Sequence, residues 1–415
     1  MDYSFAYGKK TFLVRLDASS VLANLRPNAV EVDQTGVEEV IRSLQHPIES
    51  APLRELVFPG EKIAIITSDI TRPLPSYKIL PAILDELCGA GIPDCDIMIV
   101  FGLGSHEGHS EERKRALVGD AVYDRIRCLD SDPDDCVRIG MTSRGTPVDV
   151  YRPVAQADRR ICLGNIEFHY FAGYSGGAKA IMPGVSTRDA IQNNHSAMVR
   201  PEAAAGRLKD NPVREDIEEA GRICGIDFIL NVVLDEKKEI IRSFSGHPVA
   251  AHRAGCAFLD SFYKICISEK ADIVIVSPGG FPKDINMYQA QKALDNARHA
   301  VREGGIIIWL AACSEGLGEK HFEEWMTGHE KSSDMIDHIR REFVLGGHKA
   351  AAIAMVLRKA RIFLVSDLEP DFVRSLFLEP FPDAQSAVDA AFSDLGRDAG
   401  VILMPFGGST LPECS

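Results

Sequence analysis

The sequence predicts an α/β fold made of two α/β domains, each with a largely parallel sheet. Three observations lead to this prediction. The chain has 415 residues, which suits two or three domains of about 150 residues each. Short runs recur that are apolar on both faces, as in parallel strands covered by helices. Helical patterns of spaced apolar residues lie between these runs, an alternation typical of α/β folds.

The first series of elements runs to about residue 268. Residues 3–16 are typical of two short strands around a turn at Gly8-Lys9-Lys10. A helix is expected over the apolar positions from Ile79 to Leu87, closed by Gly89 and Gly91, although Pro81 obscures where it begins. Buried strands are predicted at residues 62–67, 96–101, 160–163 and 228–233.

A second series follows Ile267-Ser268-Glu269-Lys270, where the pattern changes character. Its predicted strands are residues 273–276, 306–310, 362–365 and 401–404. Its predicted helices are residues 287–302, 334–343, 347–358 and 384–395. We therefore predict two domains, residues 1–268 and residues 269–415.

Composition excludes several classes of function. The chain has 46 basic and 60 acidic residues, a net charge of −14 that argues against binding nucleic-acid phosphates. Ten cysteines include no Cys-x-x-Cys pair, which indicates a reduced, cytoplasmic chain. No apolar run approaches the roughly 18 residues of a membrane span, and Met1-Asp2-Tyr3 does not begin a signal peptide. We expect neither nucleic acid nor membrane as a partner.

Polar residues follow three buried strands of the first series. Asp69 and Arg72 come after the first strand, His106 and His109 after the second, and His169 after the third. Ligands in open parallel sheets bind beyond the carboxyl ends of the strands. We therefore expect these side chains to meet at one edge, although loops are polar in most proteins.

The densest motif follows at once, in the sequence His169-Tyr170-Phe171-Ala172-Gly173-Tyr174-Ser175-Gly176-Gly177-Ala178-Lys179-Ala180-Ile181-Met182-Pro183-Gly184. Glycines let backbone N–H groups approach a ligand phosphate. Lys179 could pair with a phosphate or form a covalent link. A turn-rich connection without a ligand is the simpler explanation of the glycines, and the segment is not a Walker A loop.

Two further groups of polar residues are candidates for binding. His195 ends an Asn193-Asn194-His195 run, where a neutral imidazole could ligate a soft or borderline metal, although lone histidines more often pack or cap. Gln289 and Lys292 are three residues apart and share a face if their segment is helical. They could hold a carboxylate together, or they could simply form a solvated first helical turn.

Together these motifs resemble the nickel-pincer-nucleotide-dependent lactate racemase family of 2-hydroxy acid racemases and epimerases. Lys179 follows His169 by 10 residues and His195 follows Lys179 by 16, and this order and spacing match. The resemblance runs from about residue 60 to Pro412, and so covers nearly the whole chain. The matching pieces are Asp69-Ile70-Thr71-Arg72-Pro73, the Gly104/His106 loop, His169, Gly173-Tyr174-Ser175-Gly176-Gly177-Ala178-Lys179, His195, and Tyr288-Gln289 with Lys292.

The resemblance implies an active-site cleft between the two domains. Residues 1–268 would be the cofactor-binding and catalytic domain, and residues 269–415 the C-terminal α/β domain. The implied reaction inverts C2 of lactate or a related 2-hydroxy acid by hydride transfer, through a 2-keto acid intermediate. The implied cofactor is the nickel-pincer nucleotide, a pyridinium-3,5-bisthiocarboxylate mononucleotide nickel complex. Cofactor maturation proteins are implied partners, and a homo-oligomer is left open.

The resemblance also assigns a role to each candidate residue. His106 and His169 would be the two acid/base groups, and His195 would ligate nickel. The implied substrate-binding residues are Arg72, Gln289, Lys292 and Tyr288. The implied cofactor-binding residues are Lys179, which would carry the cofactor covalently, with Asp69, Thr71, Gly176, Gly177 and Pro183.

One departure from the family concerns the loop after the first catalytic histidine. The family commonly continues with Arg-Pro, whereas this chain continues Glu107-Gly108-His109. A carboxylate at Glu107 would repel a substrate carboxylate if it faced the site, or bind hydroxyls of a larger substrate. Two alternatives therefore stay open: a metal-dependent hydrolase or lyase using His106, His109 and His169, and a non-catalytic nucleotide-binding sensor that uses the glycine loop.

Overall fold

The chain forms two compact units in a computed structural model that describes residues 1–235 and 237–414. One unit is Val30–Asp260, and the other joins Met1–Ala29 to Ser261–Ser415. The predicted division into residues 1–268 and 269–415 differs from this one, because the structure joins residues 1–29 and 261–268 to the C-terminal unit. The physical reason is a strand, Val21–Asn24, that hydrogen-bonds beside residues 401–403 of the C-terminal sheet, a pairing that no local pattern reveals.

The unit Val30–Asp260 is built on a six-stranded sheet in the order β13-β12-β9-β4-β5-β6. All neighbours pair in parallel except β12 and β13, which form an antiparallel edge. The four strands predicted for this region are confirmed. The strands are β4 (Ile63–Ser68), β5 (Ile97–Gly102), β6 (Arg127–Asp130), β9 (Arg159–Asn165), β12 (Phe228–Leu234) and β13 (Ile240–Gly246).

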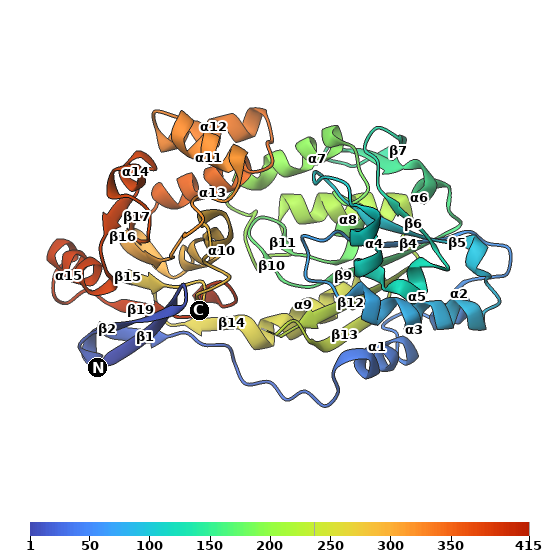
Figure 1. Ribbon diagram of the computed structural model, residues 1–415, viewed down its shortest axis with the longest axis horizontal. Helices are drawn as coiled ribbons and strands as arrows, with labels where there is room; N and C mark the ends of the chain where they lie inside the picture. Colours follow the sequence, from blue (N-terminus) through green and yellow to red (C-terminus); the bar gives the residue numbers. More distant parts are fainter. Residues whose placement is uncertain (236, 415) are drawn as a thin grey trace. The chain divides into compact units, whose positions relative to one another are not determined.

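Helices cover both faces of this sheet (Figure 1). The predicted helix is present as α3 (Ser76–Gly89), and Pro81 lies within it. The apolar side chains of α3 join those of β4, β5 and β9 in one buried core. The other helices of this unit are α1 (Gly36–Gln45), α2 (Leu53–Leu56), α4 (Glu111–Val118), α5 (Asp120–Tyr123), α6 (Arg152–Gln156), α7 (Arg188–His195), α8 (Pro212–Cys224) and α9 (Ala250–Tyr263), the last continuing into the second unit.

The strand order of this sheet reverses between β4 and β9. The chain proceeds from β4 to β5 and β6 on one side, then returns to add β9 and β12 on the other. Connections on the two sides of such a switch point leave in opposite directions, which opens a crevice at the carboxyl ends of the two strands. The loops after β4 and β9 are those that carry Asp69, Arg72 and His169.

The second unit has a fully parallel six-stranded sheet in the order β18-β17-β16-β15-β19-β3. Its order reverses between β15 and β19, so this sheet also has a switch point. The four strands predicted for the second series are confirmed. The strands are β3 (Val21–Asn24), β15 (Ala271–Val276), β16 (Val301–Leu310), β17 (Arg361–Val365), β18 (Glu379–Phe381) and β19 (Val401–Met404).

The helices of the second unit largely follow the predicted pattern. The predicted helix 287–302 is too long, because α10 ends at Ala297 and the chain enters β16 at Val301. Two short helices, α11 (Lys320–Gly328) and α14 (Pro370–Ser375), lie outside the helical ranges predicted for this series. The helices are α10 (Met287–Ala297), α11, α12 (Ser332–Arg341), α13 (Gly347–Leu357), α14 (Pro370–Ser375) and α15 (Ala384–Leu395).

Smaller strand pairs and single turns complete the fold. The predicted N-terminal hairpin is confirmed as β1 and β2, which pair antiparallel around Gly8. These elements are β1 (Asp2–Tyr7), β2 (Lys10–Arg15), β7 (Cys136–Met141), β8 (Pro147–Tyr151), β10 (Phe168–His169), β11 (Gly173–Tyr174), β14 (Lys264–Ile267), β20 (Leu411–Cys414) and the 3₁₀ turns η1 (Ala18–Ser20), η2 (Asp94–Asp96), η3 (Gly177–Ala180) and η4 (Ser196–Val199).

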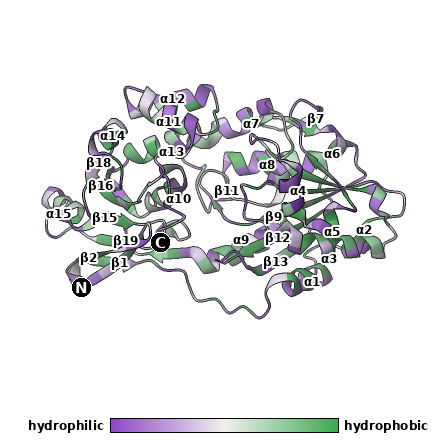
Figure 2. Cartoon of the chain, viewed as in Figure 1, coloured by the Kyte–Doolittle hydropathy of each residue, from purple (hydrophilic) through white to green (hydrophobic). Residues whose placement is uncertain are grey.

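The distribution of hydropathy agrees with this architecture. Central strands such as β15 and β19 are hydrophobic along their length, whereas α4 is largely hydrophilic (Figure 2). Parallel strands are apolar on both faces because helices cover each face. Among the described residues, no helix is long and apolar enough to cross a membrane.

Candidate active site

The loop after β4 and the loop after β5 are joined by a carboxylate–imidazole pair. Nδ1 of His106 lies 2.5 Å from Oδ2 of Asp69. Oγ1 of Thr71 donates to Oδ1 of Asp69 at 2.9 Å, so the buried carboxylate has donors on both oxygens. Arg72, in the same loop, is exposed. The structure thus brings together Asp69 and His106, two of the residues expected at this edge, with Arg72 close enough for its charge to affect Asp69.

The environment of Asp69 determines its ionisation and the position of the hydrogen on His106. Burial by itself would raise the pKa of the Asp69 carboxyl, but the hydrogen bond and charge of His106, with Thr71 and Arg72, hold that pKa below its usual value. An ionised carboxylate only accepts hydrogen bonds, so His106 donates through Nδ1. The lone pair of the neutral imidazole then lies on Nε2. This arrangement prepares His106 to accept a proton.

His109 does not join this group as a third acid/base residue. Its side chain is 1% exposed, and Nδ1 lies 2.7 Å from Oδ1 of Asp130. Nε2 accepts a hydrogen bond from the Ile70 backbone N–H at 3.2 Å. Both ring nitrogens are therefore engaged by the protein, and the hydrolase alternative loses one of its three histidines.

The loop after β9 places three further candidates around one aromatic ring. The Phe171 ring meets the His169 ring edge-on at 4.5 Å between centroids and the His195 ring at 4.9 Å. The Lys179 amine lies 5.8 Å from the centre of the same ring. Phe171 is buried, and the motif by itself gives it no role. Lys179, His169 and His195 therefore all lie beside the Phe171 ring.

His169 faces different partners from those of His106. Its Nδ1 accepts a hydrogen bond from the Ala172 backbone N–H at 3.2 Å. The neutral ring therefore carries its hydrogen on Nε2. Burial, followed by the positive charges of Lys179 and Arg72, holds the pKa of His169 well below its usual value. The ring keeps partial contact with solvent, yet protein atoms and cations surround it.

Lys179 has a perturbed amine. Lys179 is the third residue of the 3₁₀ turn η3 and is partly buried. Burial, followed by the charges of Arg214 and Arg72, holds the pKa of the Lys179 amine well below its usual value. Deprotonated amines are nucleophiles, and burial near other cations is an established way to obtain one. The structure therefore fits a covalent attachment at Lys179.

His195 is fixed through the residue before it. Its Nδ1 lies 2.9 Å from Oδ1 of Asn194. The Asn194 amide donates to Asp216 at 2.8 Å and to the Val213 carbonyl at 3.2 Å, which orients its oxygen toward His195. Nδ1 of His195 is then the donor and Nε2 carries the lone pair. Such a support of one ring nitrogen is typical of metal-ligating histidines.

The glycine pair in the loop has a packing explanation. At Gly176 (φ +75°), a Cβ would lie 2.7 Å from Oδ1 of Asn231. At Gly177 (φ +59°), a Cβ would lie 2.9 Å from the His252 ring. Side chains are thus excluded at both positions whether or not a ligand is bound. Pro183 lies close to Gly104, where the Gly104 N–H donates to the Gly184 carbonyl at 2.9 Å and ties this loop to the His106 loop.

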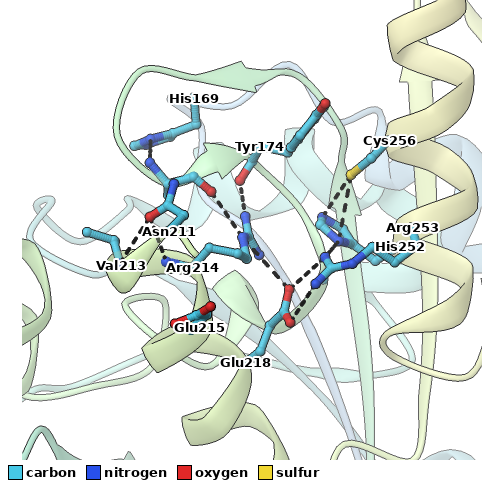
Figure 3. Close-up of polar contacts among 12 residues, drawn as sticks. His169, Tyr174, Asn211, Val213, Arg214, Glu215, Glu218, His252, Arg253 and Cys256 are labelled. Atoms are coloured by element: carbon cyan, nitrogen blue, oxygen red, sulfur yellow. Dashed lines mark hydrogen bonds and ion pairs between the residues drawn. The ribbon is translucent and has the colours of Figure 1, made fainter. Parts of the chain in front are cut away.

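Sequence reasoning missed Arg214, whose side chain is completely buried behind the loop (Figure 3). Its Nε donates to the Ala172 carbonyl at 3.0 Å, and Nη2 donates to the Tyr174 carbonyl. Its Nη1 has no hydrogen-bond partner among the residues that the structure describes. Glu218 is its nearest carboxylate, at 4.0 Å, and also pairs with Arg253. A buried arginine on α8 gives no local sequence signal, because its partners are carbonyls some 40 residues earlier.

The remaining candidates lie in the second unit, on α10 after its switch-point strand β15. Gln289 and Lys292 are both exposed, as expected for residues sharing the outer face of a helix. Tyr288 is half-buried, and its ring meets Phe322 edge-on at 5.7 Å. The Lys349 amine lies 3.7 Å from the centre of the Tyr288 ring. These three residues belong to a different unit from the other candidates.

The described residues contain no group of three or more His, Cys, Asp or Glu side chains arranged to hold a metal ion. A metal at His195 would therefore need donors from a bound molecule. The site instead gathers basic side chains, and the charges of Arg72 and Arg214 contribute to the lowered pKa of both His169 and Lys179. This arrangement suits an anionic ligand.

Family models match both units. The lactate racemase N-terminal domain model matches residues 7–206, and the lactate racemase C-terminal domain model matches residues 267–411. The chain belongs to the lactate racemase family. The resemblance inferred from the motifs is confirmed at the level of the family.

Curated relatives match at nearly full length. The lactate racemase of Thermoanaerobacterium thermosaccharolyticum is 31% identical, over 98% of this chain and 97% of that protein. The lactate racemase of Lactiplantibacillus plantarum is 32% identical, over 97% of both chains. Because these relatives are racemases, this family member is an isomerase.

Solved structures agree with the fold. The lactate racemase apoprotein from Thermoanaerobacterium thermosaccharolyticum has a TM-score of 0.90 at 30% identity, and the match covers 100% of both chains. The predicted fold class, α/β with largely parallel sheets, is confirmed. A protein from Thermotoga maritima has a TM-score of 0.66 at 17% identity, covering 93% of this chain and 100% of that one, and shares the fold.

Proposed function

We propose that this lactate racemase family member inverts C2 of a 2-hydroxy acid, lactate or a close relative, with a nickel-pincer nucleotide bound through Lys179. One observation carries the proposal. His169, Lys179 and His195 gather around Phe171 at the switch point, where Asp69 also pairs with His106. The closeness of these side chains supports the roles that the family resemblance implies for them.

The residues present fit that cofactor. Lys179 has an amine with a lowered pKa, as covalent attachment requires. The unpartnered Nη1 of Arg214 and the surplus of positive charge suit an anionic nucleotide. His195 carries its lone pair on Nε2, and histidine nitrogen is a suitable donor to square-planar nickel(II). Once bound, the nucleotide would supply an electrophilic ring able to take and return hydride, which avoids a carbanion at C2.

The chain's own residues would bind the substrate and move its hydroxyl proton. Arg72 offers a planar guanidinium that can hold the substrate carboxylate through two hydrogen bonds. Gln289, Lys292 and Tyr288 are proposed to contribute to the same task from the second unit. His106 accepts the hydroxyl proton through Nε2, and Asp69 stabilises the resulting imidazolium at Nδ1.

His169 is the proposed acid/base group for the opposite enantiomer. In its neutral form it presents Nε2–H, which donates a hydrogen bond to a substrate oxygen. To accept a proton at Nε2, the ring must move its hydrogen to Nδ1 and give up the Ala172 contact. The two histidines thus begin from opposite tautomers.

The substrate is proposed as lactate or a related 2-hydroxy acid. The two curated relatives are lactate racemases. Glu107, next to His106, is exposed, so it can turn away from a substrate carboxylate. Maturation proteins that build the cofactor, and a cytoplasmic location, complete the proposal.

The decisive experiment is maturation followed by an assay and mass spectrometry. Protein produced with the cofactor-building enzymes should racemise at least one acid of a panel of lactate, malate, longer aliphatic hydroxy acids and aldonic acids. Peptide mapping should find the cofactor mass on Lys179. Lys320→Arg, at an exposed lysine of the second unit, is the control that should keep both properties. An unmodified Lys179 after maturation would refute the cofactor assignment.

A further inference from the structure

We propose that His109, held by Asp130, is a positioning residue that fixes the Asp69 loop and thereby orients His106 for proton transfer. The inference rests on the proposed function, because it gives His106 the role of base. It concerns the Glu107-Gly108-His109 segment, which directly follows His106.

Three loops meet at the His109 ring. Asp130, at the end of β6, accepts from the His109 backbone N–H at 2.8 Å through Oδ2 and lies 2.7 Å from Nδ1 through Oδ1. Nε2 accepts from the Ile70 N–H in the loop after β4. The ring packs edge-on against Phe101, with 5.3 Å between centroids. A single side chain thus connects the carboxyl ends of β4, β5 and β6.

The hydrogen-bond directions require one tautomer. A backbone N–H can only donate, so Nε2 of His109 must carry a lone pair. The hydrogen of the neutral ring is then on Nδ1, where Asp130 accepts it. Without the Asp130 carboxylate, the Nδ1–H tautomer has no particular advantage. Asp130 therefore sets the state in which His109 can hold Ile70.

The Asp69 loop has few other anchors. The side chains of Ile70, Thr71 and Arg72 are all exposed, and Ile70 is 49% exposed despite being apolar. Hydrophobic burial therefore does not fix residues 70–72, although Leu74 after them lies in the core and the Arg72 N–H donates to the Asp69 carbonyl at 3.2 Å. The hydrogen bond from the Ile70 N–H to His109 fixes the peptide that directly follows Asp69, and so the direction of the Asp69 carboxylate toward His106.

The first test separates the two contacts of His109. An asparagine amide at position 109 can reach the place of the ring's Nδ1 but not that of Nε2, and a glutamine amide there can reach the place of Nε2. We therefore expect His109→Asn to lower kcat by about 10- to 100-fold with little change in KM, and His109→Gln to keep most of kcat. Asp130→Asn should lower kcat about as much as His109→Asn does, again with little change in KM. Equal losses in His109→Asn and His109→Gln, in step with their unfolding temperatures, would mean that the residue only stabilises the fold.

Lys114→Met provides the matched control. The Lys114 amine lies 3.8 Å from Asp130 and 2.9 Å from Glu111, and it does not contact the Asp69 loop. Losing it perturbs Asp130 by one charge while leaving the Ile70 bond intact. Its kcat and KM should stay within about twofold of the unmodified enzyme, since a partly exposed ion pair contributes little. A loss as large as that of His109→Asn would overturn the inference.

The second test needs no activity. In ¹⁵N-histidine-labelled protein without cofactor, His109 should show a protonated Nδ1 and an unprotonated Nε2. The Nδ1–H signal of His106 should weaken or move in His109→Asn and stay in Lys114→Met. A protonated Nε2 on His109 would overturn the inference even if the enzyme is an active racemase. If the spectra are as expected but the matured protein racemises no acid of the panel, the proposed function is refuted and the positioning role of His109 is not.

Discussion

His106 and His169 are expected to perform the same chemistry, yet the structure surrounds them differently. His106 pairs with the ionised carboxylate of Asp69, 2.5 Å away. His169 accepts from a backbone N–H and lies among the positive charges of Lys179 and Arg72. A carboxylate favours the charged imidazole, whereas cations and burial disfavour it. Two residues of one type thus become unequal through their neighbours.

The difference indicates which half of the reaction the resting enzyme is ready for. His106 presents a lone pair at Nε2 and a carboxylate that stabilises its protonated form. His169 presents Nε2–H and an environment that opposes a second proton. If the two histidines have the proposed roles, a hydroxy acid whose hydroxyl faces His106 would react directly, whereas its mirror image would first need a change of tautomer at His169.

Replacing either histidine should have the largest effect on activity. His106→Ala and His169→Ala are each expected to lower kcat/KM by roughly 10²- to 10⁴-fold, the usual contribution of a positioned acid/base group. Because two enantiomers have equal free energies, both directions of racemisation must fall together. Single-turnover formation of the 2-keto acid, measured from each pure enantiomer, separates the roles of the two histidines. His106→Ala should block one enantiomer and His169→Ala the other; loss of the same enantiomer in both would contradict separate roles.

Asp69→Asn should have the next largest effect, since it removes the feature that distinguishes the two histidines. The amide keeps the shape of the side chain but no longer offers an ionised acceptor to Nδ1 of His106. We expect kcat to fall by about 10- to 100-fold. Asp134→Asn, at an exposed aspartate, is the control that should leave kcat unchanged. A normal kcat in Asp69→Asn would show that the carboxylate does not set the state of His106.

The same pair predicts a smaller, pH-dependent effect on stability. The folded state lowers the pKa of Asp69, so folding favours the ionised form. This contribution is present above the unfolded pKa of about 3.9 and disappears as pH falls through the lower folded value. The difference in unfolding free energy between the unmodified chain and Asp69→Asn should therefore shrink from pH 7 to pH 3. Denaturant unfolding at both pH values measures it; a constant difference would contradict an ionised, stabilising Asp69.

Much of the fold could be predicted because it depends on local patterns. Buried strands such as 273–276 are apolar runs, and the helix 384–395 was predicted with its observed limits. The strand Val21–Asn24 was missed because its partner, β19, is some 380 residues away in the chain. The helix from 287 was extended too far because Ala297, Ala300 and Val301 continue the helical spacing of apolar residues, although the last two lie beyond the end of α10.

The candidate site could be predicted only where short motifs carry it. Asp69, His106, His169 and Lys179 follow strands or lie in a glycine-rich run. Arg214, Asp216 and Asn231 act through backbone carbonyls, an amide or a backbone N–H on other elements. Such contacts have no fixed spacing, so no sequence pattern reveals them. The substrate-binding roles of Gln289 and Lys292, which lie in the second unit, are still predictions.

The smallest expected effect concerns the charges around His169. Arg72 is exposed, so water screens its field and its removal should leave the fold intact. Its charge nevertheless lowers the pKa of both His169 and Asp69. Arg72→Met should therefore raise both pKa values in protein without cofactor. Arg188→Met, at an exposed arginine that does not contribute to either shift, should change neither.

NMR titration of the His169 imidazole and of the Asp69 carboxyl, in the unmodified chain and in Arg72→Met, would measure this prediction. Removing a cation near His169 makes its protonated form less unfavourable, so its titration moves to higher pH and becomes more like that of an ordinary histidine. If the titration of His169 were unaltered in Arg72→Met, water would screen the exposed Arg72 from the ring, and burial together with the Lys179 amine would account for the low pKa of His169.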